Sequence, residues 1–201
     1  MAEIELSQGM IEVKKRLEIL ENKLVTPGEM LGNYADLPYA IFWYPPHLEW
    51  SMRSEIRRLA VRVGQKTGKE VVCISLAELL WQAIQETVGV EALAEAERGA
   101  GFHAAQDTVN AILFRDRPLA DLLAERMKAL KEDHHIVFLT RAAAFAPLIY
   151  QMSSLLEQLK LRQIRISTVL FYPGRRDGPT TLVFMELPDR EAMGNYFVPI
   201  F

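Results

Sequence analysis

The chain has 201 residues and a mass of 22.9 kDa, enough to bury a sizeable core in one domain without disulfides or metals. Half of the residues are hydrophobic and 24% are charged, which excludes a disordered, collagen-like or coiled-coil protein. The formal net charge of −3 excludes a strongly basic nucleic-acid binder, although it allows a local basic face. The N-terminus has no signal-peptide core and no apolar run is long enough to span a bilayer, so we expect a cytoplasmic protein with no membrane contact.

The N-terminal residues predict a helical extension. Apolar residues between Met10 and Leu20 recur at a helical spacing, and charged residues fill the other faces. A second helix start is expected at residues 26–29, where a capping threonine precedes a proline and an acid. We therefore expect an extension over residues 1–36 and a single α/β domain over residues 37–201.

Beyond the extension, apolar runs of strand length alternate with amphipathic stretches of helical length. The run from Tyr39 to Tyr44 is uninterrupted, as expected for a strand that is covered on both faces. Ser75 and Glu78 form a capping box, which predicts the start of a helix. The expected strands are 39–44, 70–75, 135–139, 166–172 and 181–184 with a short edge strand at 196–198, and the expected helices are 48–63, 76–87, short helices within 88–114, 118–130 and 148–159.

This alternation predicts an α/β fold: a mainly parallel sheet of about five strands, with helices on both faces and an antiparallel C-terminal edge. The outline is Rossmann-like, or that of a degenerate P-loop fold without its phosphate loop. Pro45 and Pro46 follow the first strand, where a phosphate loop would need backbone N–H donors that proline lacks. We therefore expect no nucleotide and no other cofactor.

Catalytic patterns are missing from the sequence. The four histidines form no pair at the i, i+4 spacing that places two metal ligands on one helix face, so no metal site is predicted. The single cysteine, Cys73, allows no internal disulfide and lies within an expected buried strand, where a thiol is usually inert. No nucleophile motif and no carboxylate pair at strand ends is present, so we expect a protein that is not an enzyme.

Two charged features of the sequence are candidates for a binding surface. The first is a basic face between Arg53 and Lys69, on the expected helix and the turn after it, where six cations occur with one acid, Glu55. Such a face is either an ordinary solvated helix surface or a docking surface for an acidic partner or a phosphate backbone. The candidate binding residues on it are Arg53, Arg57, Arg58 and Arg62, followed by Lys66 and Lys69.

The second feature is the expected loop at residues 173–179, which follows a buried strand. Arg175, Arg176 and Asp177 give it charge at the strand end, where α/β proteins place their sites. The Asp177-Gly178 pair is also a common turn sequence, so it has a purely structural interpretation.

The same loop resembles a known family. VLFYPG at residues 169–174, followed by Asp177-Gly178, is similar to the VLFYPG-x-x-DG signature of the BrxB component of BREX bacteriophage-exclusion systems. Segments that resemble other parts of the family extend the resemblance to residues 38–201, including the strand and proline at 41–46. The residues that match the family motifs are Phe138, Leu139, Thr140, Pro147, Phe171, Tyr172, Pro173, Gly174, Asp177, Gly178, Asn195 and Tyr196.

The sequence departs from the family pattern at three positions. Arg141 stands where the family usually has glycine, Ala146 replaces the aromatic residue before Pro147, and Val198 stands where an arginine is common. These departures indicate a divergent branch.

The resemblance implies a non-catalytic part of a multi-gene phage-defence system. Such systems contain an adenine-specific DNA methyltransferase, a large ATPase and a PglZ-like protein related to phosphatases. The expected function is that of a scaffold or adaptor that binds the PglZ-like protein, the ATPase, or both, with the methyltransferase complex as a further partner. The alternative is an accessory module that contacts nucleic acid through the basic face Arg53–Lys69. A third hypothesis, cryptic nucleotide binding, rests on the sheet outline alone.

Overall fold

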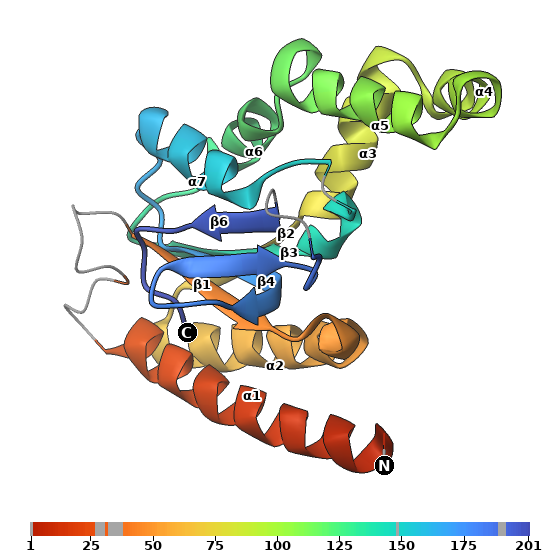
Figure 1. The fold of residues 1–201 in the computed structure, drawn as a ribbon. Helices are drawn as coiled ribbons and strands as arrows, with labels where there is room; N and C mark the ends of the chain where they lie inside the picture. The colour runs from red at the N-terminus through yellow and green to blue at the C-terminus, as the bar shows by residue number, and fades with distance from the viewer. Residues whose placement is uncertain (1, 27–30, 32–37, 148, 189–191) are drawn as a thin grey trace.

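The computed structural model describes residues 2–26, 31, 38–147, 149–188 and 192–201 (Figure 1). Residues 27–29 of the expected second helix start, and Leu148, lie outside the described residues. The helices are α1 (Ala2–Val25), α2 (Glu49–Thr67), α3 (Leu76–Thr87), α4 (Val90–Ala100), α5 (Phe102–Ala111), α6 (Leu119–Met127) and α7 (Met152–Leu161), with short helical turns at Pro46–Leu48, Ile112–Asp116 and Ala142–Phe145. The strands are β1 (Tyr39–Tyr44), β2 (Glu70–Ser75), β3 (His135–Thr140), β4 (Thr168–Arg176), β5 (Thr181–Phe184) and β6 (Met193–Asn195).

Four of the strands run parallel. β4 pairs with β3 on one side and with β1 on the other, and β2 pairs with the far side of β3. β5 pairs antiparallel with the end of β4, and β6 pairs antiparallel with β5. The expected parallel sheet with an antiparallel C-terminal part is therefore confirmed.

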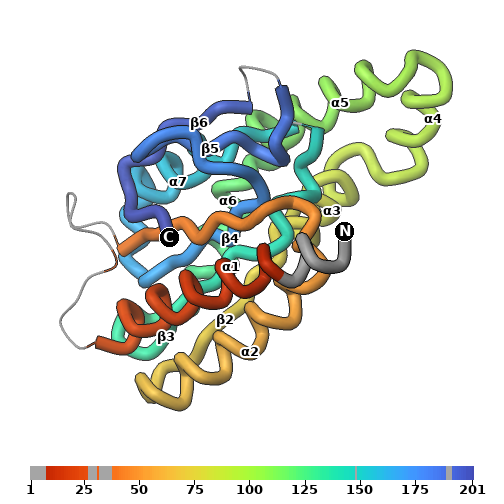
Figure 2. The backbone as a smooth tube through the Cα atoms, turned by 60° about the horizontal axis from the view of Figure 1, so that its bottom comes forward, coloured from red at the N-terminus to blue at the C-terminus, as the bar shows by residue number. Residues whose placement is uncertain are grey.

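Helices cover the sheet on two faces, as expected (Figures 1 and 2). α1 and α2 lie on one face, where their apolar residues form a core with Phe42, Phe138 and Phe171 of the sheet. α3, α6 and α7 lie on the other face, over a second core that includes Leu139 and Tyr172. Adjacent side chains of β3 and β4 point into opposite cores, which explains their unbroken apolar runs.

α1 packs against its own chain. Its apolar stripe, which includes Val13 and Leu20, is buried against α2 and the sheet. Arg16 donates from Nη1 to the backbone oxygens of Trp43 (2.9 Å) and Phe201 (3.2 Å). Its guanidinium also stacks 4.1 Å from the centre of the Trp43 ring, so α1 is tied to both β1 and the C-terminus.

Residues 70–75 form a strand, as expected, but the expectation that this strand is buried is wrong. β2 occupies these residues, but only Ile74 is buried, and Cys73 is exposed. β2 pairs with β3 alone among the described strands, so it forms an edge that the helices cover incompletely.

The expected loop at 173–179 is also partly wrong, because β4 continues to Arg176. Gly174 allows this continuation: a Cβ atom there would lie 2.2 Å from the backbone oxygen of Val183, so only glycine lets β5 approach. A Pro-Gly pair is expected to end a strand, yet Pro173-Gly174 lies inside β4.

The expected edge strand at 196–198 is wrong as well. β6 precedes it, at Met193–Asn195, and the last residues pair with β1 through a parallel bridge between Ile41 and Ile200. Both segments are short, so sequence periodicity could not distinguish between them.

α4 and α5 form a helical hairpin over residues 90–111 that projects away from the sheet in both views (Figures 1 and 2). The hairpin confirms the short helices expected between 88 and 114. None of the residues of α4 is buried, whereas α5 buries Ala105 and Val109. Among the described residues, no helix has the length and apolar character needed to cross a membrane.

Candidate functional site

The basic face on α2 is largely neutralised by neighbouring acids. Arg53 donates from Nε to Glu49 (3.1 Å), and Arg58 donates from Nη1 to Glu55 (2.9 Å). Arg57 makes no ion pair or hydrogen bond within the part of the chain that the structure describes. The four arginines that we selected on this helix are therefore not one uniform cationic surface.

The C-terminal half of the basic face holds α1 in place. Arg62 donates from Nε to Glu21 (2.8 Å) and Lys66 donates from Nζ to the same carboxylate (2.7 Å). Lys69 donates to the backbone oxygen of Glu132 (3.2 Å). Burial pushes the pKa of Glu21 upward, but the hydrogen bonds from Lys66 and Arg62 outweigh it and hold the pKa of Glu21 below its usual value.

We expect the Glu21 contact to stabilise the protein at neutral pH and to weaken in acid. Because the folded-state pKa of Glu21 is lowered, its contribution is present above the unfolded-state pKa and is lost as the pH falls through the folded-state pKa. Glu21→Gln should cost about 1 kcal/mol at pH 7, since both cations are about half exposed.

Urea unfolding of the wild type and Glu21→Gln at several pH values measures this difference. The difference in the free energy of unfolding between the two proteins should shrink toward zero as the pH is lowered to about 3. A difference that stayed constant across this range would show that the carboxylate charge contributes nothing.

The charged residues Arg175, Arg176 and Asp177, at the end of β4 and in the turn after it, are exposed. Arg176 donates from Nε to Gly178 (2.9 Å) and from Nη2 to Pro179 (2.8 Å), both to backbone oxygens, so it holds its own turn. Arg175 lies 3.6 Å from Asp177, and both side chains are about half exposed. Arg176 is therefore held by backbone contacts at the end of β4, and Arg175 is the more available of the two arginines to a partner.

Most residues that match the family motifs are structural. Phe138, Leu139, Phe171 and Tyr172 are fully or almost fully buried in β3 and β4. Burial raises the pKa of Tyr172 far above its usual value, so the hydroxyl remains protonated. These positions build the two cores of the sheet.

The remaining motif residues lie in β3, the C-terminal strands and the turns. Tyr196 is buried with its ring edge-on to that of Tyr172, and Asn195 accepts a hydrogen bond from Thr181 Oγ1 (2.9 Å). Pro173 and Gly174 are buried in β4, and Thr140 donates to the backbone oxygen of Ile74 (3.3 Å). Asp177 and Gly178 form the exposed turn before β5, and Pro147 is exposed after a cis peptide bond.

A polar cavity of about 310 Å³ lies at the edge of the sheet where the parallel strands end. This edge is the usual ligand position in open α/β sheets. We call the cavity the arginine pocket because Arg53 and Arg57 of α2 and Arg141, after β3, all line it. The other lining residues are Tyr44, Glu49, Ile56, Cys73, Ser75, Glu78 and Thr140.

Sequence reasoning missed this pocket. Arg53 and Arg57 were selected as part of a helix face, and Arg141 only as a departure from a family motif. The three arginines come together because β2 and β3 are neighbours in the sheet and α2 crosses the face beside them, a relation that depends on strand order.

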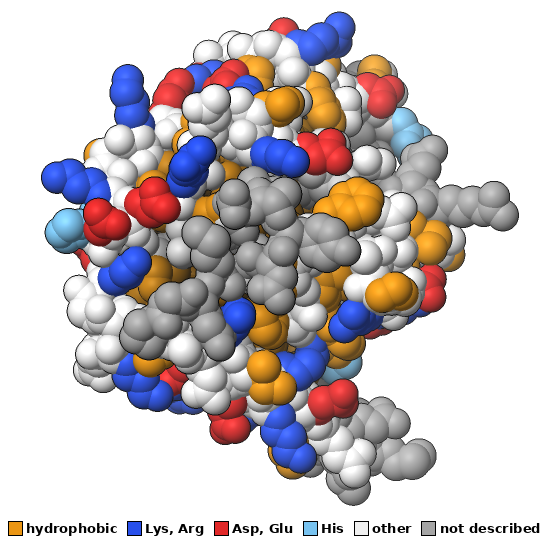
Figure 3. All heavy atoms as spheres, turned by 90° about the vertical axis from the view of Figure 1, so that its left-hand side faces the viewer, with side chains coloured by type: hydrophobic (Ala, Val, Ile, Leu, Met, Phe, Trp, Pro, Cys, Tyr) orange, Lys and Arg blue, Asp and Glu red, His pale blue; other side chains and the backbone are white. Residues whose placement is uncertain are grey.

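The opposite edge of the sheet, where the parallel strands begin, has a different surface. Among the described residues on the face shown in Figure 3, basic and acidic side chains are interspersed with hydrophobic ones, and they form no large area of one sign. Among the described residues, no group of three or more histidine, cysteine, aspartate or glutamate side chains could hold a metal ion.

A family model described as "BREX protein BrxB" matches residues 72–197 of this chain. The chain belongs to the BrxB family. It is therefore a component of a BREX phage-defence system. No curated protein matches the chain, and no solved structure matches it.

The BrxB match begins within β2 and ends beyond β6. It includes the α4–α5 hairpin, the exposed loop after β4, and the strand β3 that leads to Arg141. The strand and proline at residues 41–46, and the arginines of α2, lie outside the matched segment. The BrxB family assignment therefore rests on the central and C-terminal parts of the fold.

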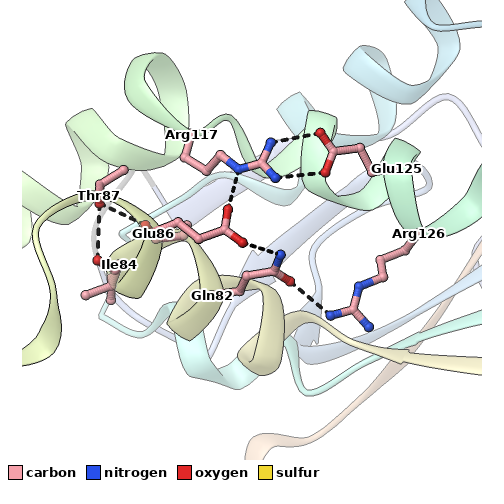
Figure 4. Close-up of polar contacts among 8 residues, drawn as sticks. Gln82, Ile84, Glu86, Thr87, Arg117, Glu125 and Arg126 are labelled. Carbon is pink, nitrogen blue, oxygen red and sulfur yellow. Dashed lines mark hydrogen bonds and ion pairs between the residues drawn. The ribbon is translucent and has the colours of Figure 1, made fainter.

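A polar network lies between the helices that precede and follow the hairpin in this BrxB-family chain (Figure 4). Arg117 donates to both carboxylate oxygens of Glu125 (2.8 Å each) and from Nε to Glu86 (2.7 Å). Gln82 donates to Glu86 (2.7 Å) and accepts from Arg126 (2.9 Å). The hydrogen bonds from Arg117 lower the pKa of both glutamates. The network joins α3 and α6, the helices on either side of the hairpin in sequence.

Proposed function

We propose that this BrxB-family chain is a non-catalytic, cytoplasmic scaffold of a BREX system, which binds the PglZ-like protein or the large ATPase through the α4–α5 hairpin. The projection of this hairpin from the sheet is the observation that carries the proposal (Figures 1 and 2). α4 is 11 residues long and buries none of them; Leu93, which is partly buried, packs against the core, so α4 contributes little to the core of its own domain. An element with this exposure is available to another protein.

Exposed apolar side chains occur on the hairpin and on the segments next to it in sequence. Of the 12 large hydrophobic side chains that are exposed in the described part of the chain, five lie between residues 81 and 114. Exposed apolar groups that gather on one part of a surface are typical of protein–protein contacts. The five are Trp81, Val88, Val90, Phe102 and Phe114.

The charge of the hairpin favours a basic partner surface. Glu91, Glu95 and Glu97 are all exposed on α4, and Arg98 is the single cation of that helix. A mixed apolar and acidic surface fits a partner with a complementary apolar and basic face. The polar network joins α3 to α6, the helices that precede and follow the hairpin in the chain, and so supports the part of the fold from which the hairpin projects.

Co-expression of the BREX proteins with an affinity tag on this chain tests the proposal. We expect Val90→Ser with Phe102→Ser to reduce capture of the PglZ-like protein or the ATPase at least about tenfold, since each loses a buried apolar contact in the complex. Both residues are exposed in the free chain, so the thermal unfolding temperature should change little.

Leu161→Ser is the matched control, because Leu161 is 75% exposed at the end of α7, outside the hairpin. It should leave capture unchanged. Equal capture by the control and by the hairpin variant would contradict the role of the hairpin, and no capture by the wild type would contradict the scaffold.

The charged end of β4 and the turn after it are a second proposed contact. Arg175→Ala removes an exposed cation whose nearest partner, Asp177, is itself exposed, so the fold should be unaffected. In the same capture experiment, a salt-sensitive loss of binding would assign the loop to the interface.

We further propose that residues 1–36 extend a single domain over residues 37–201, which the packing of α1 on its own sheet supports.

A further inference from the structure

The arginine pocket has more positive than negative charge. Glu49 is already used, because it accepts hydrogen bonds from Tyr44 (2.5 Å) and Arg53 (3.1 Å). Within the described residues, Arg57 and Arg141 form neither an ion pair nor a hydrogen bond. The pocket therefore holds three guanidiniums against the two carboxylates of Glu49 and Glu78, and neither carboxylate is paired with Arg57 or Arg141.

The backbone of Arg141 supports a functional role for its side chain. It has φ 62° and ψ 35°, the left-handed conformation that favours glycine. A bulky residue in this conformation destabilises the fold, and such residues cluster at functional sites. Here the conformation turns the chain directly after Thr140 at the end of β3, with Arg141 at the rim of the pocket.

Hydroxyl groups surround the arginines and provide neutral polar contacts. Ser75 Oγ accepts from the backbone N–H of Glu78 (3.3 Å), which leaves its own O–H free to donate toward the cavity. Burial and the Glu49 carboxylate raise the pKa of Tyr44, which keeps that hydroxyl protonated. The Tyr44 hydroxyl donates that proton to Glu49, so the cavity combines its guanidinium donors with one free hydroxyl donor, that of Ser75.

We propose that the arginine pocket binds a phosphate monoester of the size of a nucleoside monophosphate or smaller. Planar guanidinium groups bind phosphate oxygens through paired hydrogen bonds, and arginine is favoured wherever this geometry is needed. The volume of about 310 Å³ lies at the lower end of the range for small-molecule sites. This inference is independent of the scaffold function, because no residue of the hairpin lines the pocket.

Thermal unfolding of the full chain in inorganic phosphate or AMP, compared with sodium chloride at the same ionic strength, tests the site. At a concentration about tenfold above Kd, we expect the unfolding temperature to rise by about 3–6 °C. Arg57→Gln should abolish the rise. Arg58→Gln is the matched control, because Arg58 is on the same helix but is paired with Glu55 and does not line the pocket.

Arg141→Gly provides a second and opposite readout. It removes a cation and also relieves the left-handed backbone of a residue with a Cβ atom. The free protein should therefore unfold at a higher temperature than the wild type, while the rise caused by phosphate is lost. A variant that merely failed to fold could not give this result.

The outcomes separate the ligand sources. Equal shifts with phosphate and AMP would mean that the pocket recognises the phosphate group alone, and a larger shift with AMP would add the nucleoside; both support the site. No shift with either ligand at about 10 mM would overturn the proposal. Equal shifts in the wild type, Arg57→Gln and Arg141→Gly would also overturn the proposal. A shift with glutarate but not with phosphate would overturn it as well.

Discussion

Replacing Phe171 by alanine is expected to lower the free energy of unfolding by about 3–5 kcal/mol. Phe171 is fully buried in the middle of β4, and its ring lies 5.1 Å from that of Phe138 and 5.8 Å from that of Phe42. The three rings come from three adjacent parallel strands, so no single neighbour can move into the space that the substitution leaves. A loss of this size is a large part of the stability of a typical domain.

Urea unfolding followed by circular dichroism measures this effect, with Phe197→Ala as the control because Phe197 is 73% exposed. The control should change the free energy of unfolding by less than about 0.5 kcal/mol. A loss below about 1 kcal/mol for Phe171→Ala would show that this core is not closely packed. Loss of phage defence in this variant would report on folding, although Phe171 belongs to a family motif.

Gly174→Ala is expected to cost about 3 kcal/mol, and the damage should be confined largely to β5 and β6. The added Cβ atom would lie 2.2 Å from the backbone oxygen of Val183 and 2.8 Å from the Tyr172 ring. A backbone oxygen cannot move aside as the end of a flexible side chain can. β5 therefore has to move away from β4. The burial of Tyr196 over the same strands would then be lost.

Amide hydrogen exchange distinguishes this local effect from global unfolding. In Gly174→Ala, the amides of β5 should exchange faster, whereas those of β3 should keep most of their protection. Gly99→Ala is the control: Gly99 is in helix α4 with open space around it, so alanine should stabilise the protein by up to about 1 kcal/mol. Unchanged protection of β5 in Gly174→Ala would contradict the close approach of the two strands.

Local features of the fold were predictable from the sequence. The buried strand 39–44, the Ser75 cap and the helical stripe that begins at Met10 all depend on neighbours within a few residues. Cys73 was predicted to be buried because an apolar run does not reveal whether its strand lies at the centre or at the edge of a sheet. Gly174 was expected in a loop for a related reason. Its role is to let β5 approach β4, and a pairing between two strands is not visible in the residues around Gly174.

The candidate sites were harder to predict than the fold. The neutralisation of Arg62 depends on Glu21, which lies 41 positions away in another helix. The arginine pocket needs residues from α2 and from the end of β3, which come together only after the parallel strands have been ordered. The family motifs identified the family correctly, yet most of their residues build the core, so they marked the fold more than the binding surface.

Light scattering on the purified chain, alone and mixed with its cognate PglZ-like protein and with the large ATPase, tests the scaffold function most directly. The scaffold function predicts a heavier complex of fixed stoichiometry with at least one of them, which the hairpin variant Val90→Ser with Phe102→Ser should fail to form. Unchanged masses in both mixtures, at concentrations well above micromolar, would contradict a scaffold function. That result would leave the phosphate site of the arginine pocket unaffected, because its test uses this chain alone.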